Sequence, residues 1–170
     1  MKRLVTAAAL AALSIPASAY AGDWTGAYLG AGVGSTKADT QNLDDSDAVY
    51  SLHGGYDYDM GEWVLGGELE YSDTNIGVPS VGTIDQIGRF KVRAGYDFGQ
   101  VMGYFLAGVT RAETDFGNDN GMNYGIGVAY NVTDNFVLSG EYIRDDFDNF
   151  ANTGSDMKND TFQVRASYRF

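Results

Sequence analysis

The chain has 170 residues with 23 acidic and 11 basic side chains, and its formal net charge of −12 argues against a nucleic-acid partner. It contains no cysteine, so neither disulfide bonds nor a lipid attached to a cysteine can hold an exported domain in place. Beyond the N-terminal segment no run of 18 apolar residues occurs, which argues against a membrane-spanning helix.

The N-terminal segment has the features of a cleaved secretory signal peptide, assigned to residues 1–21. Lys2 and Arg3 precede an apolar stretch that is too short to anchor the chain in a membrane. We expect cleavage after Ala21, with a cut after residue 19 as the alternative. Residues 22–170 would then form a single domain whose 9 basic and 23 acidic side chains give a formal charge of −14.

Runs of alternating apolar and polar residues follow, each typical of a β-strand with one apolar and one polar face. The predicted strands cover residues 24–35, 48–58, 62–72, 84–98 and 101–113, then two runs around 123–130 and 136–142, and finally 161–170. The last strand alternates without a miss, with Phe162 and Val164 opposite Gln163 and Arg165. In the fifth run both faces are apolar, so the pattern leaves open which face points outward.

Long and short connectors alternate between these strands. The long ones cover residues 37–47, 73–83, 114–121 and 145–158, and the short ones 59–61, 99–100 and 131–135. This order is typical of outer-membrane barrels with short periplasmic turns and long external loops. The sheet must close, because an open edge would leave backbone amides unpaired in hydrocarbon. We therefore predict an all-β fold, an eight-stranded antiparallel up-and-down transmembrane β-barrel with apolar side chains toward lipid.

Aromatic residues gather near both ends of the predicted strands. The periplasmic ends carry Trp24, Tyr58, Trp63, Tyr96, Phe98, Tyr130, Phe136, Tyr168 and Phe170. The external ends carry Tyr50, Tyr71, Tyr124, Tyr142 and Phe162. Belts of aromatic residues at both membrane surfaces are typical of transmembrane barrels, whereas a soluble barrel would concentrate aromatic residues inside. We therefore predict two lipid-facing aromatic girdles.

Charged residues recur on the polar faces of four strands. Each lies five residues from an aromatic residue of the periplasmic girdle, which predicts a similar depth in the lumen for Glu68, Lys91, Glu141 and Arg165. Neighbouring strands would let Glu68 pair with Lys91, and Glu141 with Arg165. Glu70, Arg89 and Arg93 extend this predicted network. Because eight strands enclose a space that side chains nearly fill, these charges would plug the barrel.

Short motifs rich in glycine and tyrosine recur over residues 22–170. They are Thr25-Gly-Ala-Tyr-Leu-Gly30, Gly54-Gly-Tyr56, Gly67-Glu-Leu-Glu-Tyr71, Lys91-Val-Arg-Ala-Gly-Tyr96, Gly140-Glu-Tyr142 and Ala166-Ser-Tyr-Arg-Phe170. These motifs resemble the strands of small OmpA-like outer-membrane barrels of the porin-like or surface-antigen type. The chain ends with the predicted barrel, so we do not carry over the cell-wall tethering of full-length OmpA.

The resemblance has two functional implications. Tyr168 and Phe170 are similar to the C-terminal signal that the outer-membrane barrel assembly machinery recognises, which implies this machinery and periplasmic chaperones as partners during biogenesis. In OmpA-like barrels a comparable cluster of Glu, Lys and Arg blocks the lumen and can rearrange to pass ions. Both a permanent plug and a narrow gate for small ions therefore remain open for this chain.

Other candidate sites are weaker. Lipid-modifying barrel enzymes need a histidine beside a serine or glutamate, but His53 falls on the lumen face, so we expect no enzyme. Two acidic groups lack the spacing of an EF-hand and are interpreted as solvated loop acids: Asp44, Asp45 and Asp47, then Asp145, Asp146 and Asp148. Divalent cations could still bridge them to lipopolysaccharide phosphates. We expect no cofactor and no metal-binding residue.

These features together predict an integral outer-membrane protein of a Gram-negative bacterium. We expect a monomer in contact with outer-membrane lipid and lipopolysaccharide, with a structural or surface-exposed role, a lumen closed by ion pairs and, secondarily, narrow conduction of small ions. An adhesin or surface antigen acting through its external loops would have the same barrel. A soluble lipocalin-like carrier would need an apolar lumen, against which the charged residues argue.

Overall fold

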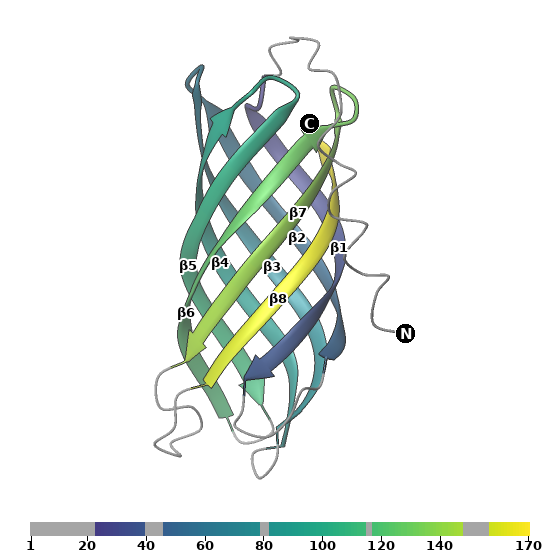
Figure 1. Cartoon of the computed structure of the whole chain (residues 1–170), viewed down its shortest axis with the longest axis vertical. Coiled ribbons are helices and arrows are strands. Elements are labelled where there is room, and N and C mark those ends of the chain that lie inside the picture. Colours follow the sequence, from purple (N-terminus) through teal and green to yellow (C-terminus); the bar gives the residue numbers. More distant parts are fainter. Residues whose placement is uncertain (1–22, 40–45, 79–81, 115–116, 148–156) are drawn as a thin grey trace, which may run out of the picture.

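The computed structural model describes residues 23–39, 46–78, 82–114, 117–147 and 157–170, and these described residues form eight strands. The strands are β1 (Gly26–Asp39), β2 (Ser46–Asp59), β3 (Trp63–Val78), β4 (Gly82–Asp97), β5 (Val101–Thr114), β6 (Gly117–Asn131), β7 (Phe136–Phe147) and β8 (Met157–Arg169). Each strand pairs antiparallel with the next, and β8 pairs back onto β1 (Figure 1). The predicted eight-stranded up-and-down barrel is confirmed.

The outside of the barrel is apolar and the inside is polar, as predicted from the alternation. Leu69 and Phe105 point outward and are 66% and 72% exposed, whereas Glu68 is 1% exposed. This also decides the facing of β5, where Phe105 and Val109 point outward and Tyr104 and Leu106 inward. The structure describes no helix that is long and apolar enough to cross a membrane.

Several strands extend further than the sequence pattern indicated. The β3–β4 pairing continues to Val78 opposite Gly82, and the β5–β6 pairing to Thr114 opposite Gly117. The connectors predicted at 73–83 and 114–121 are therefore mostly strand, which corrects that prediction. A tilted strand needs only about 9–11 residues to cross the hydrocarbon region, so the additional residues project beyond it.

The short connectors form tight turns at one end of the barrel, the upper end in Figure 1, where the C-terminus also lies. The Met60 amide donates to the Trp63 carbonyl at 2.8 Å, and the Phe98 amide donates to the Val101 carbonyl at 2.9 Å. Gly61 in the first of these turns has φ 101°, a left-handed conformation that glycine adopts without steric cost. These turns fix the register that sets which side chains enter the lumen.

Candidate functional site: a charged network in the lumen

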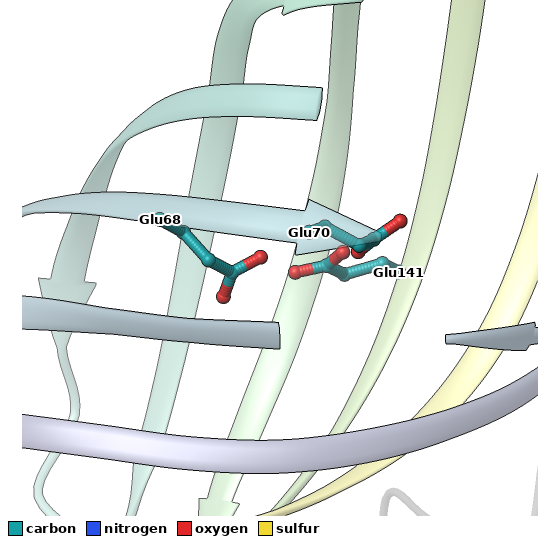
Figure 2. A group of neighbouring side chains, drawn as sticks. All are labelled: Glu68, Glu70 and Glu141. Carbon is teal, nitrogen blue, oxygen red and sulfur yellow. The ribbon is translucent and has the colours of Figure 1, made fainter. Parts of the chain in front are cut away.

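Three glutamates converge in the middle of the lumen. Glu68 and Glu70 come from β3 and Glu141 from β7, and Figure 2 shows their carboxylates pointing toward one another. One oxygen from each lies within 4.8 Å of the others, a grouping that could hold a metal ion. The Lys91 ammonium takes that place, with Nζ 2.6 Å from Glu68, 2.7 Å from Glu70 and 3.1 Å from Glu141. A tethered cation thus offsets the repulsion among three buried carboxylates.

Arg165 joins the same carboxylates from β8. Its guanidinium pairs with Glu141 and, at 2.5 Å, with Glu68. Both predicted pairs, Glu68 with Lys91 and Glu141 with Arg165, are present. The first joins direct strand partners, whereas Glu141 lies opposite Gln163, so its pairing with Arg165 runs diagonally. The network is therefore more cross-linked than two separate pairs, because each base contacts carboxylates from two strands.

Arg89 extends the network toward the end with the long connectors. It donates to Glu70 at 2.7 Å and binds Asp145 in a bidentate pair with distances of 3.0 and 2.6 Å. The sequence interpretation placed Asp145 in a solvated external loop, which was wrong. β7 continues to Phe147, and Asp145 shares the inward parity of Glu141 and is fully buried. Asp44, Asp45 and Asp148 lie outside the described residues.

Arg93 extends the network in the other direction. It forms an ion pair with Asp57 of β2, which the predicted cluster did not include. Its guanidinium also lies 4.6 Å from the ring centre of Tyr28 and 5.2 Å from that of Tyr104, distances typical of cation–π contacts. Arg169 completes this end, 3.5 Å from Asp57. Asp57 and Arg169 were not included in the predicted cluster. Both have the inward parity of their strands, and this parity is the sequence signal that could have identified them.

Charge in the lumen is balanced. Among the side chains that the structure describes, the buried acids are Asp57, Glu68, Glu70, Glu141 and Asp145, and the buried bases are Arg89, Lys91, Arg93, Arg165 and Arg169. These five acids and five bases cancel, although the chain as a whole is strongly acidic. Unpaired charges are costly to bury, so each lumen charge needs an opposite partner. The excess acidic charge of the chain is therefore not carried by these ten buried side chains.

Two tyrosines lock the glutamates in position. The Tyr28 hydroxyl donates to Glu68 at 2.8 Å, and the Tyr104 hydroxyl donates to Glu141 at 2.7 Å. Inward-facing glycines make room for both rings. A Cβ at Gly55 would lie 2.7 Å from the Tyr28 ring, and a Cβ at Gly127 would overlap the Tyr104 ring. These two glycines thus make room for large aromatic side chains in a narrow lumen.

Trp24 closes the mouth of the lumen at the short-turn end. It was predicted to be in the lipid-facing girdle, but it is 0% exposed, which corrects that prediction. Its indole N–H donates to Asp97 at 2.9 Å, its backbone N–H donates to Asp59 at 3.1 Å, and Arg169 lies 4.9 Å from its ring centre. It belongs to an apolar cluster with, among others, Val64, Met102, Ala129 and Val137.

The other predicted girdle residues lie on the outside of the barrel. At the short-turn end, Trp63 packs edge-on against Tyr96 at 5.3 Å between ring centres, and Phe136 packs against Tyr168 at 5.2 Å. Tyr58, Phe98 and Phe170 are exposed there, with Tyr130 partly exposed. At the opposite end the exposed aromatic residues are Tyr50, Tyr71, Tyr124, Tyr142 and Phe162. An aromatic group is therefore present toward each end of the barrel, and Tyr56, Phe90 and Phe105 are further exposed aromatic residues.

His53 lies in the lumen and is 2% exposed. Its Nδ1 accepts a hydrogen bond from Arg165 Nε at 3.3 Å, and its Nε2 lies 2.7 Å from the Ser167 hydroxyl. Because Nδ1 accepts, Nε2 carries the proton and donates to Ser167. A histidine in this state cannot take a proton from the serine, so this His–Ser pair has no activated nucleophile.

A closed barrel with an apolar exterior, two aromatic belts and a charge-filled interior defines a transmembrane β-barrel of the outer-membrane type. The model of the outer membrane protein beta-barrel domain family matches residues 5–170. The chain belongs to this family. The comparison with curated protein sequences gave no match.

Solved structures of small outer-membrane barrels have the same fold. Neisserial surface protein A is 20% identical with a TM-score of 0.61, and the match covers 86% of this chain and 98% of that one. Ail, the attachment invasion locus protein of Yersinia pestis, is 20% identical with a TM-score of 0.57 over 86% and 99% of the two chains. The N-terminal barrel domain of Pseudomonas aeruginosa OprF is 14% identical with a TM-score of 0.54 over 84% and 97%.

Proposed function

We propose that the protein is a surface-exposed structural barrel of a Gram-negative outer membrane whose lumen is closed to solutes, with narrow conduction of small ions as a secondary activity. The observation that carries this proposal is the balanced network of buried ion pairs across the lumen. Such a network fills the space between the described strands with charged side chains, whereas a carried apolar ligand would need an apolar lining. It therefore favours a closed barrel over a lipocalin-like carrier.

Conduction would require the network to rearrange. Lys91 and Arg165 each contact Glu68 and Glu141, so either base can keep one contact while releasing the other. Such an exchange avoids a fully unpaired buried charge, which would cost about 3–5 kcal/mol. The arrangement thus supports rare, small-ion conduction and argues against a permanently open pore.

Planar-bilayer recordings of Arg165→Ala test this proposal. We expect little current through the wild-type protein and more current when Arg165 is removed, because its guanidinium then no longer bridges Glu68 and Glu141. Arg111→Ala is the matched control, since Arg111 is exposed on the outside of β5. Heat-modifiable gel mobility establishes that each variant is folded. Equal currents from wild type and Arg165→Ala would contradict the ion-bridge model.

A role as an adhesin or surface antigen is the second candidate. It is favoured by the similarity in fold to a protein named for attachment and invasion, Ail of Yersinia pestis. In this case the barrel would act as a scaffold and the external connectors would contact the partner. Adhesion of cells that display the wild-type barrel, compared with cells displaying a barrel with shortened connectors, separates this role from a purely structural one. Equal adhesion would exclude it.

The C-terminal residues fit a role in assembly. Tyr168 and Phe170 pack edge-on at 5.1 Å between ring centres on the outside of β8, and the Phe170 amide donates to the Ala27 carbonyl of β1 at 2.9 Å. These residues thus lie where the barrel closes. Recognition of this terminus by the barrel assembly machinery predicts that Phe170→Ala lowers the amount of folded protein in the outer membrane, measured by heat-modifiable mobility of membrane fractions. An unchanged amount would contradict it.

A further inference from the structure

Asn123 is buried in the lumen without a hydrogen-bond partner. It faces inward from β6 and is 2% exposed, yet neither its Oδ1 nor its Nδ2 is bonded to any residue that the structure describes. The other described side chains with a buried unpartnered atom are Glu68, Asn131, Asp146 and Arg169. A buried polar group without a partner costs free energy, so an amide with both of its polar atoms in this state requires a physical explanation.

The strand register places Asn123 in one row with the charged network. Lys91 of β4 lies opposite Gly108 of β5, and Gly108 lies opposite Asn123. On its other side Asn123 lies opposite Asp145 of β7. Lys91 and Asn123 are therefore two strand spacings apart, about 9–10 Å. A Cβ at Gly108 would overlap the Phe90 carbonyl oxygen, so the β5 position between Lys91 and Asn123 cannot carry a side chain.

The inward face of β6 is also bare around Asn123. The neighbouring inward positions on this strand are Gly121 and Gly125. A Cβ at Gly125 would overlap the Tyr142 carbonyl oxygen, and a Cβ at Gly121 would lie 2.5 Å from the Asp146 carbonyl oxygen. No side chain of residues 121–125 other than that of Asn123 therefore points into the lumen, and β6 itself does not cover the amide.

The three glutamates shown in Figure 2 would each keep a base if Lys91 moved away. Arg165 pairs with two of them, and Arg89 donates to the third, Glu70, at 2.7 Å. Departure of Lys91 thus leaves none of these carboxylates buried without an opposite charge, which is the costly state. A lysine suits such a move, because its ammonium is a compact charge with three donors on a flexible four-carbon stem.

We infer that Asn123 is the second partner of Lys91: when the lumen network rearranges, the Lys91 ammonium leaves the glutamates and donates to Asn123 Oδ1, beside Asp145. The inference rests on the proposed function, because it states where the released base goes. The closed barrel is favoured since three carboxylates hold the ammonium there. The exchange satisfies the Asn123 oxygen and takes the tethered cation out of the middle of the lumen. Asn123 is thus a positioning residue for conduction.

Single-channel recordings of Asn123→Asp in planar bilayers test this inference. A carboxylate at this position should hold the Lys91 ammonium more strongly than the amide does, because hydrogen bonds between two charged groups are roughly twice as strong as neutral ones. We expect the fraction of time spent open to rise about tenfold, which corresponds to about 1.4 kcal/mol. Heat-modifiable gel mobility establishes that the variant is folded.

Asn159→Asp is the matched control. Asn159 is also fully buried and also lies opposite Asp145, but it belongs to β8, four strands from β4. Its amide already has partners, because Asn159 Oδ1 accepts from the Thr36 hydroxyl at 2.5 Å and Asn159 Nδ2 donates to Asp145 at 3.3 Å. The control therefore adds the same charge beside Asp145 without offering it to Lys91, and its open fraction should stay close to that of the wild type.

A second measurement follows Lys91 without any current. Three lysines follow the predicted signal peptide, and Lys37 and Lys158 are exposed, so an Nζ proton signal protected from exchange with water identifies Lys91. In NMR spectra of the full mature chain with ¹⁵N-labelled lysine, Asn123→Asp should shift this signal, whereas Asn159→Asp should leave it in place.

The two measurements separate failure of this inference from failure of the proposed function. In barrels that conduct, equal open fractions for Asn123→Asp and Asn159→Asp would overturn the inference. An unmoved Lys91 signal in Asn123→Asp would overturn it whether or not current is observed. Absence of current from every folded variant, together with a shifted Lys91 signal, would contradict the proposed conduction and still support the exchange of partners.

Discussion

The middle of the lumen and its short-turn mouth are closed by different kinds of contact. In the middle, carboxylates and bases from β3, β4, β7 and β8 pair with more than one partner each. At the mouth, Trp24 lies in an apolar cluster that includes Val64 and Met102. Under the proposed function, the paired charges would exchange partners without leaving the lumen, whereas the apolar cluster would open only if its residues separated. We therefore propose two barriers in series, an adaptable one in the middle of the lumen and a rigid one at its mouth.

The largest effect is expected when both barriers are removed. When two barriers lie in series, removing one leaves the other to limit the current. The double variant with Trp24→Ala and Arg165→Ala should therefore conduct more than the sum of the currents of the two single variants. Planar-bilayer recordings measure this difference. The control is Trp63→Ala combined with Arg165→Ala, because Trp63 is at the same end of the barrel but faces outward. Additive currents would show that the two regions do not act as separate barriers.

Replacing Lys91 should destabilise the barrel most among single changes. Lys91→Met leaves Glu68, Glu70 and Glu141 facing one another with fewer bases, and breaking buried ion pairs costs about 3–5 kcal/mol. Urea titration in lipid vesicles, followed by gel mobility, measures the free energy of unfolding. Lys37→Met on the exposed outer face is the control and should stay within about 0.5 kcal/mol of wild type. A loss no larger than the control would mean that Lys91 does not hold the carboxylates together.

Trp24→Ala should lower the free energy of unfolding by about 3 kcal/mol, the cost of truncating a large buried aromatic side chain. Trp24→Phe keeps most of the packing and loses the hydrogen bond to Asp97, so it should cost about 1 kcal/mol. The same urea titration compares the two variants. If phenylalanine cost as much as alanine, the hydrogen bond rather than apolar packing would secure the mouth.

The smallest effect concerns the glycine that makes room for Tyr104. Gly127→Ala places a methyl group against the Tyr104 ring, which is held by its bond to Glu141, and overpacking of this kind costs about 1–3 kcal/mol. Gly140→Ala is the control, because a Cβ at Gly140 meets no atom within 4 Å. Comparable unfolding of the two variants would show that the Tyr104 ring can move aside freely.

Alternation made most of the fold predictable. Membrane and lumen impose opposite requirements on successive side chains, so parity alone places Leu69 outside and Glu68 inside. The same rule would have placed Trp24 correctly, because Trp24 lies four residues before the inward-facing Tyr28 and therefore has the same parity. Its position near a strand end favoured the girdle interpretation instead. The strand ends at residues 73–78, 82–83 and 117–121 were not predicted, because the regular alternation of apolar and polar residues does not continue into them.

The partners within the lumen were only partly predictable. Residue spacing identifies neighbours on adjacent strands, such as Glu68 and Lys91. Contacts across the lumen depend on barrel closure and side-chain length, as for Arg165 of β8 and Glu68 of β3. Asp145 was missed because its strand was predicted to be too short. The sequence thus predicted which charged residues lie in the lumen and their approximate depth, but it did not predict which of them pair across the lumen.

The cancellation of five buried acids by five buried bases affects how the protein should respond to ionic strength. Dissolved ions screen charges that they can approach, and at about 0.15 M salt the screening length is about 8 Å. The paired lumen charges are shielded by the barrel wall, whereas water reaches exposed acids such as Glu62, Asp73 and Asp134. Added salt should therefore weaken repulsion between neighbouring copies in a crowded membrane while leaving the interior of each barrel unchanged.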